Sequence, residues 1–239
     1  MMKASPFEFR FRFLILAIIY LLGFVAPWNY ALHLDTIRTW QLLAAWVYRT
    51  GLISFSSATI AILVLGITVA FVAALLRTWG SAYLGISVVQ SGGLHGDGVV
   101  AAGPYRWVRN PLYIGTFLHT PVLALLMPPS GAVFCIVAVG FFQWRLIGAE
   151  EDFLSGRLGE AYVAYCARVP RVVPALRPRL ADSTVRPAWG AAVLGEVYMW
   201  GVVAAFAVAG WRYDSQLIIQ GVIISLGVSL VVRAFLPKR

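Results

Sequence analysis

The sequence predicts an all-α membrane protein, a polytopic helical bundle with about six crossings. Hydrophobic residues make up 60% of the 239 residues and charged residues only 12%, and the mean hydropathy is +0.80. Soluble domains carry about 25% charged residues, roughly twice this share. Several uncharged runs are also long enough to cross a bilayer, which takes about 20 helical residues. The composition therefore places most of the chain in lipid.

Net charge and cysteine content limit the function classes further. The net charge is +9, but the basic residues lie at the ends of apolar runs, which is typical of membrane topology and not of a nucleic-acid-binding face. The two cysteines, Cys135 and Cys166, are too few for a disulfide framework. The sequence contains no cluster with metal-ligand spacing and no Ser/His/Asp set, so we expect no metal site.

The first two crossings are predicted over residues 13–34 and 50–76. The first run follows a basic N-terminal segment and carries no formal charge. A signal peptide is the alternative, but the run is long for one and no small-residue cleavage site closes it. The second run ends at Arg77. We therefore expect an N-terminal two-span region over residues 1–76.

A glycine-rich loop and a helical hairpin are expected next. The loop covers residues 77–110, with a short interfacial helix near Trp79–Val89. The following apolar run is interrupted by Met-Pro-Pro-Ser-Gly at 127–131, and proline cannot continue a helix. This pattern predicts a tight hairpin whose second helix continues out of the membrane into a charged segment. The predicted arms are residues 111–127 and 131–149, within a core region of residues 77–178.

The C-terminal region, residues 179–239, is predicted to hold an arginine-rich connector and two crossings, residues 189–211 and 215–235. Lys and Arg gather on the cytoplasmic side of membrane proteins. With six crossings and both termini in the cytoplasm, all but three of the 19 Lys and Arg residues lie on that side, the exceptions being Arg38, Arg49 and Arg212. This orientation also puts both segments described next on the cytoplasmic face.

The first segment that could carry chemistry is Gly103–Gly115. Asn110 is a good N-cap and Pro111 suits the first turn of a helix. A helix start presents free N–H groups that favour an anion such as a carboxylate. Arg106 and Arg109 add positive charge, and Tyr105 and Tyr113 add flat surfaces. The alternative is an interfacial anchor of Arg, Trp and Tyr.

The second segment runs from Glu150 to Arg171. Glu151 lies at helical spacing with Leu154, Leu158, Tyr162 and Tyr165, so its carboxylate is expected on a half-buried face. A carboxylate there needs a cationic partner, either a protein arginine or a ligand ammonium. The alternative is an amphipathic juxtamembrane helix held by salt bridges, with arginines on anionic lipid.

Together the two segments resemble a known family. The sequence Gly-Pro-Tyr-Arg-Trp-Val-Arg-Asn-Pro-Leu-Tyr-Ile-Gly is similar to the Gly-x-Tyr-x-x-x-Arg-His-Pro-x-Tyr-x-Gly motif of isoprenylcysteine carboxyl methyltransferases and phospholipid methyltransferases. The second segment is similar to the C-terminal signature of the same family. The resemblance covers about residues 77–178. The family's usual His is Asn110 here, and Asn can replace it if the family uses that position as a hydrogen-bond donor.

The resemblance implies an integral membrane methyltransferase that uses S-adenosylmethionine at the cytoplasmic face and takes a lipophilic acceptor from the bilayer. It implies that Arg168 faces the acceptor and that Glu151 also serves the reaction. His95, in the glycine-rich loop, either contacts the cofactor or caps a turn. The implied cofactor contacts are Tyr105, Arg106, Arg109, Asn110, Pro111, Tyr113, Gly115, Glu150, Glu151, Tyr162, Tyr165 and His95.

The acceptor is the least determined part of this prediction. The composition resembles that of a bacterial inner-membrane protein, for which a lipid or small isoprenoid carboxylate or amine is more expected than a prenylated protein. Two other functions stay open. One is an NADPH-dependent membrane reductase of the sterol-reductase type. The other is a non-catalytic lipid-binding membrane protein with the same fold.

Overall fold

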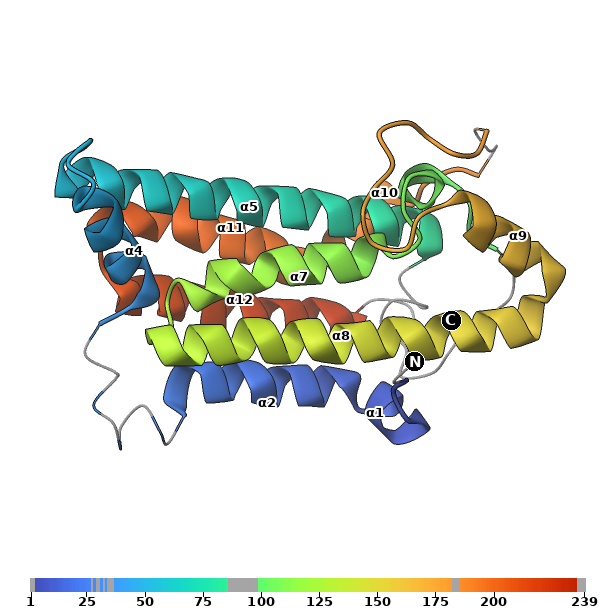
Figure 1. The fold of residues 1–239 in the computed structure, drawn as a ribbon, viewed down its shortest axis with the longest axis horizontal. Coiled ribbons are helices and arrows are strands. Elements are labelled where there is room, and N and C mark those ends of the chain that lie inside the picture. The colour runs from blue at the N-terminus through green and yellow to red at the C-terminus, as the bar shows by residue number, and fades with distance from the viewer. Residues whose placement is uncertain are drawn as a thin grey trace.

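The computed structural model describes residues 3–26, 28, 31, 33, 37–85, 99–181 and 185–235. The regular elements in these residues are helices, and most of them run along the long axis of the molecule, with α4 crossing one end (Figure 1). The predicted all-α class is therefore confirmed. The elements are α1 (Pro6–Arg10), α2 (Arg12–Val25), α4 (Thr39–Tyr48), α5 (Phe55–Leu84), η1 (Gly103–Arg106), α7 (Pro111–Ala124), α8 (Pro129–Leu158), α9 (Glu160–Arg168), α10 (Trp189–Gly195), α11 (Val197–Ala209), η2 (Gly210–Arg212) and α12 (Ser215–Phe235).

Three of the helices in the described ranges, α5, α8 and α12, are long and apolar enough to cross a membrane. The pair α10 and α11 makes a fourth if the two are counted as one span. Helices α2 and α7 have 14 residues each, fewer than the roughly 20 that a straight crossing needs. The polytopic helical fold is thus confirmed, and the count of six crossings stays a prediction.

The long helix α5 continues about two turns beyond its predicted end at Arg77. The Arg77 guanidinium forms a bidentate ion pair with Glu196, with distances of 2.7 Å and 2.9 Å. A paired charge can stay inside a helical bundle, so Arg77 does not force the chain into water. The predicted end of the helix at Arg77 was therefore wrong. The predicted boundary between residues 76 and 77 falls inside α5.

The predicted crossing 189–211 is broken at Glu196, where α10 and α11 meet at an angle of 64°. Glu196 is only 3% exposed, and its carboxylate also accepts a hydrogen bond of 2.7 Å from the Ser81 hydroxyl on α5. The break lies where the chain turns a buried acid toward two donors on α5. If this predicted segment forms one crossing, it does so as a broken span of two helices.

The predicted hairpin is confirmed, with α7 ending at Ala124 and α8 beginning at Pro129. The start of α4 is fixed to the turn, because the Thr39 backbone N–H and hydroxyl both donate to the Met127 carbonyl. At its other end α8 stops before Gly159, which has a φ of +55°. The continuous helix expected through Tyr165 is therefore divided into α8 and α9.

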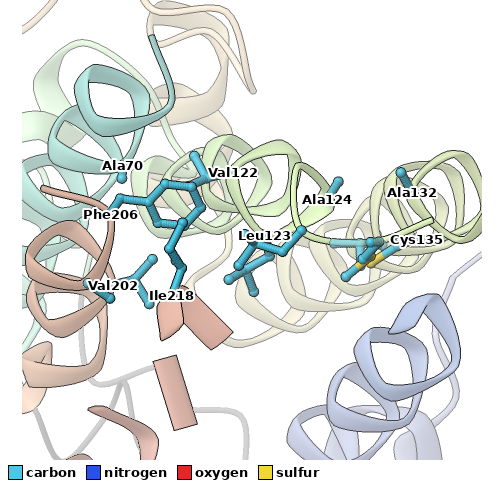
Figure 2. Close-up of a cluster of buried hydrophobic side chains, with 13 residues drawn as sticks. Ala70, Val122, Leu123, Ala124, Ala132, Cys135, Val202, Phe206 and Ile218 are labelled. Atoms are coloured by element: carbon cyan, nitrogen blue, oxygen red, sulfur yellow. The ribbon is translucent and has the colours of Figure 1, made fainter. Parts of the chain in front are cut away.

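The core of the bundle is an apolar cluster shared by α5, α7, α8, α11 and α12. Phe206 and Ile218 pack against Val122 and Leu123 at its centre (Figure 2). In lipid, close backbone approach contributes more to helix packing than the burial of apolar area does. The crossing of α2 and α8 illustrates this, because a Cβ atom on Gly131 would lie 1.9 Å from the Gly23 carbonyl oxygen.

Candidate cofactor pocket

The two sequence segments meet at one end of the bundle, where the C-terminal half of α8 approaches α9 and the start of α7 (Figure 1). The break at Gly159 turns α9 back, so that Tyr162 and Tyr165 pack against Leu154 and Leu158 of α8. The Tyr165 hydroxyl donates a hydrogen bond of 2.9 Å to the Tyr105 carbonyl. α9 is thereby fixed to η1.

A cavity of about 100 Å³ lies between these elements. Eight of the residues predicted to contact the cofactor line it, together with apolar residues from α1, α5 and the chain before η1. The predicted residues come from both segments, which are separated by the hairpin in sequence. They are Tyr105, Arg109, Asn110, Pro111, Tyr113, Glu150, Tyr162 and Tyr165.

Two buried donor atoms of the cavity lining have no hydrogen-bond partner in the part of the chain that the structure describes. They are the Tyr105 hydroxyl and Nε of Arg109. Burial raises the pKa of the Tyr105 phenol well above its usual value, so this group stays a neutral donor. Buried polar atoms without partners are costly and uncommon. Their presence in one cavity indicates a site shaped for a polar ligand.

Glu150 supplies the acidic group of the cavity. Its Oε2 atom accepts a hydrogen bond of 2.8 Å from the Tyr113 hydroxyl. This single contact leaves most of the lone-pair capacity of the carboxylate available to a ligand. Glu150 can therefore pair with a ligand ammonium.

Glu151, one residue further along α8, takes part in a different set of contacts. Its side chain is 9% exposed and accepts hydrogen bonds from both Nε and Nη2 of Arg171, and Nη1 of Arg109 lies 3.4 Å from it. Glu151 is absent from the cavity lining. Through these contacts Glu151 joins the end of α8 to the chain that follows α9, and its predicted catalytic role stays a prediction.

Asn110 occupies the N-cap position of α7, but its side chain does not cap the helix. Instead its amide donates hydrogen bonds of 3.2 Å to Glu151 and 3.1 Å to the Arg171 carbonyl. The expected side-chain cap was wrong, because these two acceptors are already in place beside it. Asn110 thus acts as a double hydrogen-bond donor, a role for which an amide is suited.

The structure places three other predicted site residues away from the cavity. Nε of Arg106 donates to the Leu180 carbonyl at 2.9 Å. Gly115 faces α5, where an added Cβ would lie 2.4 Å from Cγ of Arg77. Arg168 is exposed and lines a separate basin. His95 lies outside the described residues.

Phe9 was not predicted, and it lines the cavity from α1. The N-terminal segment that contains α1 is held against the second half of α8 by two ion pairs, Lys3 with Asp152 and Glu8 with Arg145. Nothing in the local sequence marks Phe9, because it reaches the site only through this tertiary contact. Within the described ranges, no group of His, Cys, Asp and Glu residues could hold a metal ion.

A second cavity of about 100 Å³ adjoins the first and lies between α2, α5, α7 and α8. The two share Phe9, Leu84, Leu112, Tyr113 and Glu150. The lining of the second cavity also includes Arg12 and Gln143. Gln143 is only 4% exposed. The arrangement offers a polar site next to the first cavity and inside the helical bundle.

A comparison with known proteins matches the segment that holds most of the cavity lining. The family model for phospholipid methyltransferases matches residues 60–161. Residues 60–161 are therefore similar to the phospholipid methyltransferase family. This methyltransferase segment contains α7, α8 and the Gly103–Gly115 motif, so the predicted recognition of a membrane methyltransferase family is confirmed.

Curated relatives agree with this family. The chain is 36% identical over 93 residues to the protein-S-isoprenylcysteine O-methyltransferases of Mus musculus and Rattus norvegicus. The aligned part is 38% of this chain and 32% of each relative, so the chain spans about a third of the length of the curated relatives it matches. No solved structure matches the chain at a significant level.

Proposed function

We propose that the protein transfers a methyl group from S-adenosylmethionine to a lipophilic acceptor at the cytoplasmic face of the membrane. The observation that carries this proposal is the cavity between the two methyltransferase motifs, which combines a carboxylate with two unpartnered buried donors. S-adenosylmethionine has an ammonium group, a carboxylate, hydroxyls and an adenine ring. The cavity lining offers a complementary group for each of them.

The residues present fit this cofactor chemically. Glu150 would pair with its ammonium group, and Arg109 and the start of α7 would hold its carboxylate. The Tyr105 hydroxyl would serve a ribose or ring acceptor. Tyr162 and Tyr165, whose ring centroids lie 5.8 Å apart, would pack on the adenine or the positively charged sulfur. Ligand clefts usually measure roughly 300–1,000 Å³, so binding requires the walls of this cavity to move apart.

Bound S-adenosylmethionine would supply an electrophilic methyl group on a sulfonium. The protein's contribution is to align the nucleophile with that methyl group and to exclude water. Glu150 and Tyr113 lie in the wall shared by the two cavities, so they can position both reactants. A carboxylate nucleophile needs orientation only, whereas an amine must lose a proton, for which a neighbouring acid is a suitable acceptor.

The second cavity is the proposed place for the reactive end of the acceptor. It opens among Leu16, Leu112 and Leu146, which suit an apolar chain, and the Gln143 amide can bind a polar headgroup. The names of the family and of the relatives point to lipid-linked acceptors, and we propose an acceptor of this class for this protein. The distribution of Lys and Arg supports the cytoplasmic orientation.

Isothermal titration of the full chain in nanodiscs tests the proposal. We expect binding of S-adenosylmethionine and none of NADPH, followed by transfer of a labelled methyl group to a member of a panel of lipid and isoprenoid acids and amines. Binding of NADPH alone would instead support a reductase. Binding of S-adenosylmethionine without turnover on the panel would support a non-catalytic role.

A further inference from the structure

An exposed basin of about 560 Å³ lies along the segment that follows α9, from Val169 to Arg179, here called the connector. Arg109, Arg168 and Arg179 line it together with Val173, Pro174 and Leu176, and its lining contains no acidic residue. The methyl-transfer proposal does not use this basin. Its lining combines positive charge with apolar side chains.

The charges of the basin are largely uncompensated. Arg109 lies 3.4 Å from Glu151, but neither the Arg168 nor the Arg179 side chain has an ion-pair partner within the described ranges. Val173 is 78% exposed and Leu176 is 97% exposed. Large apolar side chains this exposed, next to arginines, are typical of a surface that meets both the acyl region and the phosphates of a membrane.

The connector also starts at the right depth for such a contact. The Arg171 guanidinium lies 5.4 Å from the centre of the Trp144 ring, and Val172 shares a small apolar cavity with Trp144 and Ile147. Helix α8 carries no charge from Pro129 to Trp144, and its first charged residue is Arg145. Tryptophan marks the boundary between lipid and water. The start of the connector therefore lies beside α8 at that boundary.

The same connector is hydrogen-bonded to the first methyltransferase motif. The Arg109 N–H donates to the Pro170 carbonyl at 2.9 Å, the Ala175 N–H to the Trp107 carbonyl at 3.0 Å, and the Arg179 N–H to the Arg106 carbonyl at 2.8 Å. A ligand that orders the connector would thus also order one wall of the cofactor cavity.

We infer that the basin binds the headgroup of an anionic phospholipid, with its phosphate between Arg168 and Arg179 and its acyl chains beside Val173 and Leu176. This inference is independent of methyl transfer, since it requires only the basin and a bilayer. It assigns to Arg168 a lipid contact in place of the acceptor contact that the sequence predicted.

The test uses the full chain in detergent, with phosphatidylglycerol, phosphatidylcholine and inorganic phosphate as probes. Native mass spectrometry would count retained lipid, and thermal unfolding would report stabilisation. We expect phosphatidylglycerol to bind and to raise the melting temperature, while the other two probes do neither. The double variant R168Q/R179Q should bind phosphatidylglycerol roughly 30-fold more weakly, since it loses two arginines at an anionic surface.

Two controls keep the test specific. R49Q/R212Q removes the same charge from exposed positions outside the basin and should bind phosphatidylglycerol like the unmodified protein. R168K/R179K keeps the charge and should retain most of the binding. If the double Gln variant does not fold, each single Gln variant should show part of the loss. Unchanged binding by the Gln variants would overturn the inference, as would equal stabilisation by inorganic phosphate.

Discussion

The Asn110 amide donates a hydrogen bond of 3.2 Å to the Glu151 carboxylate, and this contact joins the two methyltransferase motifs directly. Arg171 approaches the same carboxylate from the connector. Three separate parts of the chain therefore depend on one acid that does not face the cofactor cavity. The two neighbouring acids therefore have different surroundings, since Glu151 is ion-paired and Glu150 lines the cavity.

Replacing Glu151 by Gln should destabilise the protein by about 2–3 kcal/mol. Loss of one partner of a fully buried ion pair costs about 3–5 kcal/mol, but Arg171 is 27% exposed and solvent compensates part of this. In a double-mutant cycle, E151Q combined with R171Q should cost less than the sum of the two single changes. Thermal unfolding of the four proteins measures this coupling, and simple additivity would show that the pair is not coupled.

Replacing Glu150 by Gln should weaken S-adenosylmethionine binding roughly 10- to 100-fold, because a charge-assisted contact with the cofactor ammonium is lost. Gln can still accept the hydrogen bond from Tyr113, so the melting temperature should stay close to that of the unmodified protein. Isothermal titration measures the affinity. An unaltered affinity would place the ammonium elsewhere.

Replacing Tyr105 by Phe should stabilise the ligand-free protein by about 1 kcal/mol, since it removes a buried hydroxyl that has no partner. The same change should weaken cofactor binding roughly fivefold, because that hydroxyl is proposed to contact the cofactor. Thermal unfolding and titration together test this opposite pair of effects. A purely structural role for Tyr105 predicts that the stability changes and the affinity does not.

Replacing Gly115 by Ala should destabilise the protein by about 1–3 kcal/mol, because the new Cβ would lie 2.4 Å from Cγ of Arg77 and 3.1 Å from the Ala73 carbonyl oxygen. Gly156 in α8 is the matched control, since a Cβ there meets nothing within 4 Å. G156A should stabilise the protein by about 0.5–1 kcal/mol. Equal melting temperatures for the two variants would contradict the tight packing at Gly115.

Replacing Arg168 by Gln should change S-adenosylmethionine affinity by less than about twofold, because this side chain lies outside the cofactor cavity. The titration should be carried out in detergent without anionic lipid, so that an indirect effect through the connector does not contribute. R109Q, which alters the cavity lining itself, serves as the positive control and should weaken binding clearly. A large loss of S-adenosylmethionine affinity in R168Q would support the predicted position of Arg168 beside the reactants.

The sequence predicted those features that depend on local chemistry. The Pro-Pro-Ser-Gly interruption located the hairpin between α7 and α8, and the two motif segments located the cavity. It did not separate the roles of Glu150 and Glu151. Adjacent helical residues point about 100° apart, and which one faces the cavity depends on how α8 is rotated against α7. The break at Gly159 also turns α9 out of line with α8, so Tyr162 and Tyr165 do not continue the α8 helix face on which helical spacing placed them.

The errors in the helix boundaries have a different origin. Arg77 was predicted to end the second crossing, and Glu196 lies inside the predicted crossing 189–211. They neutralise one another across 119 positions of sequence. No window of local sequence contains both residues, so the continuation of α5 and the break between α10 and α11 could only be seen in three dimensions.

The length of α8 has a consequence for where the protein can work. The helix is 30 residues long, about 45 Å, but only its first part, up to Trp144, is uncharged, which is roughly 24 Å. The hydrocarbon core of a typical bilayer is about 30 Å thick. A thick, sterol-rich membrane would draw Arg145 and the cavity acid Glu150 toward hydrocarbon, whereas a thin one would leave them in the headgroup layer. Hydrophobic mismatch should therefore couple bilayer thickness to ligand affinity and favour thin membranes for this protein.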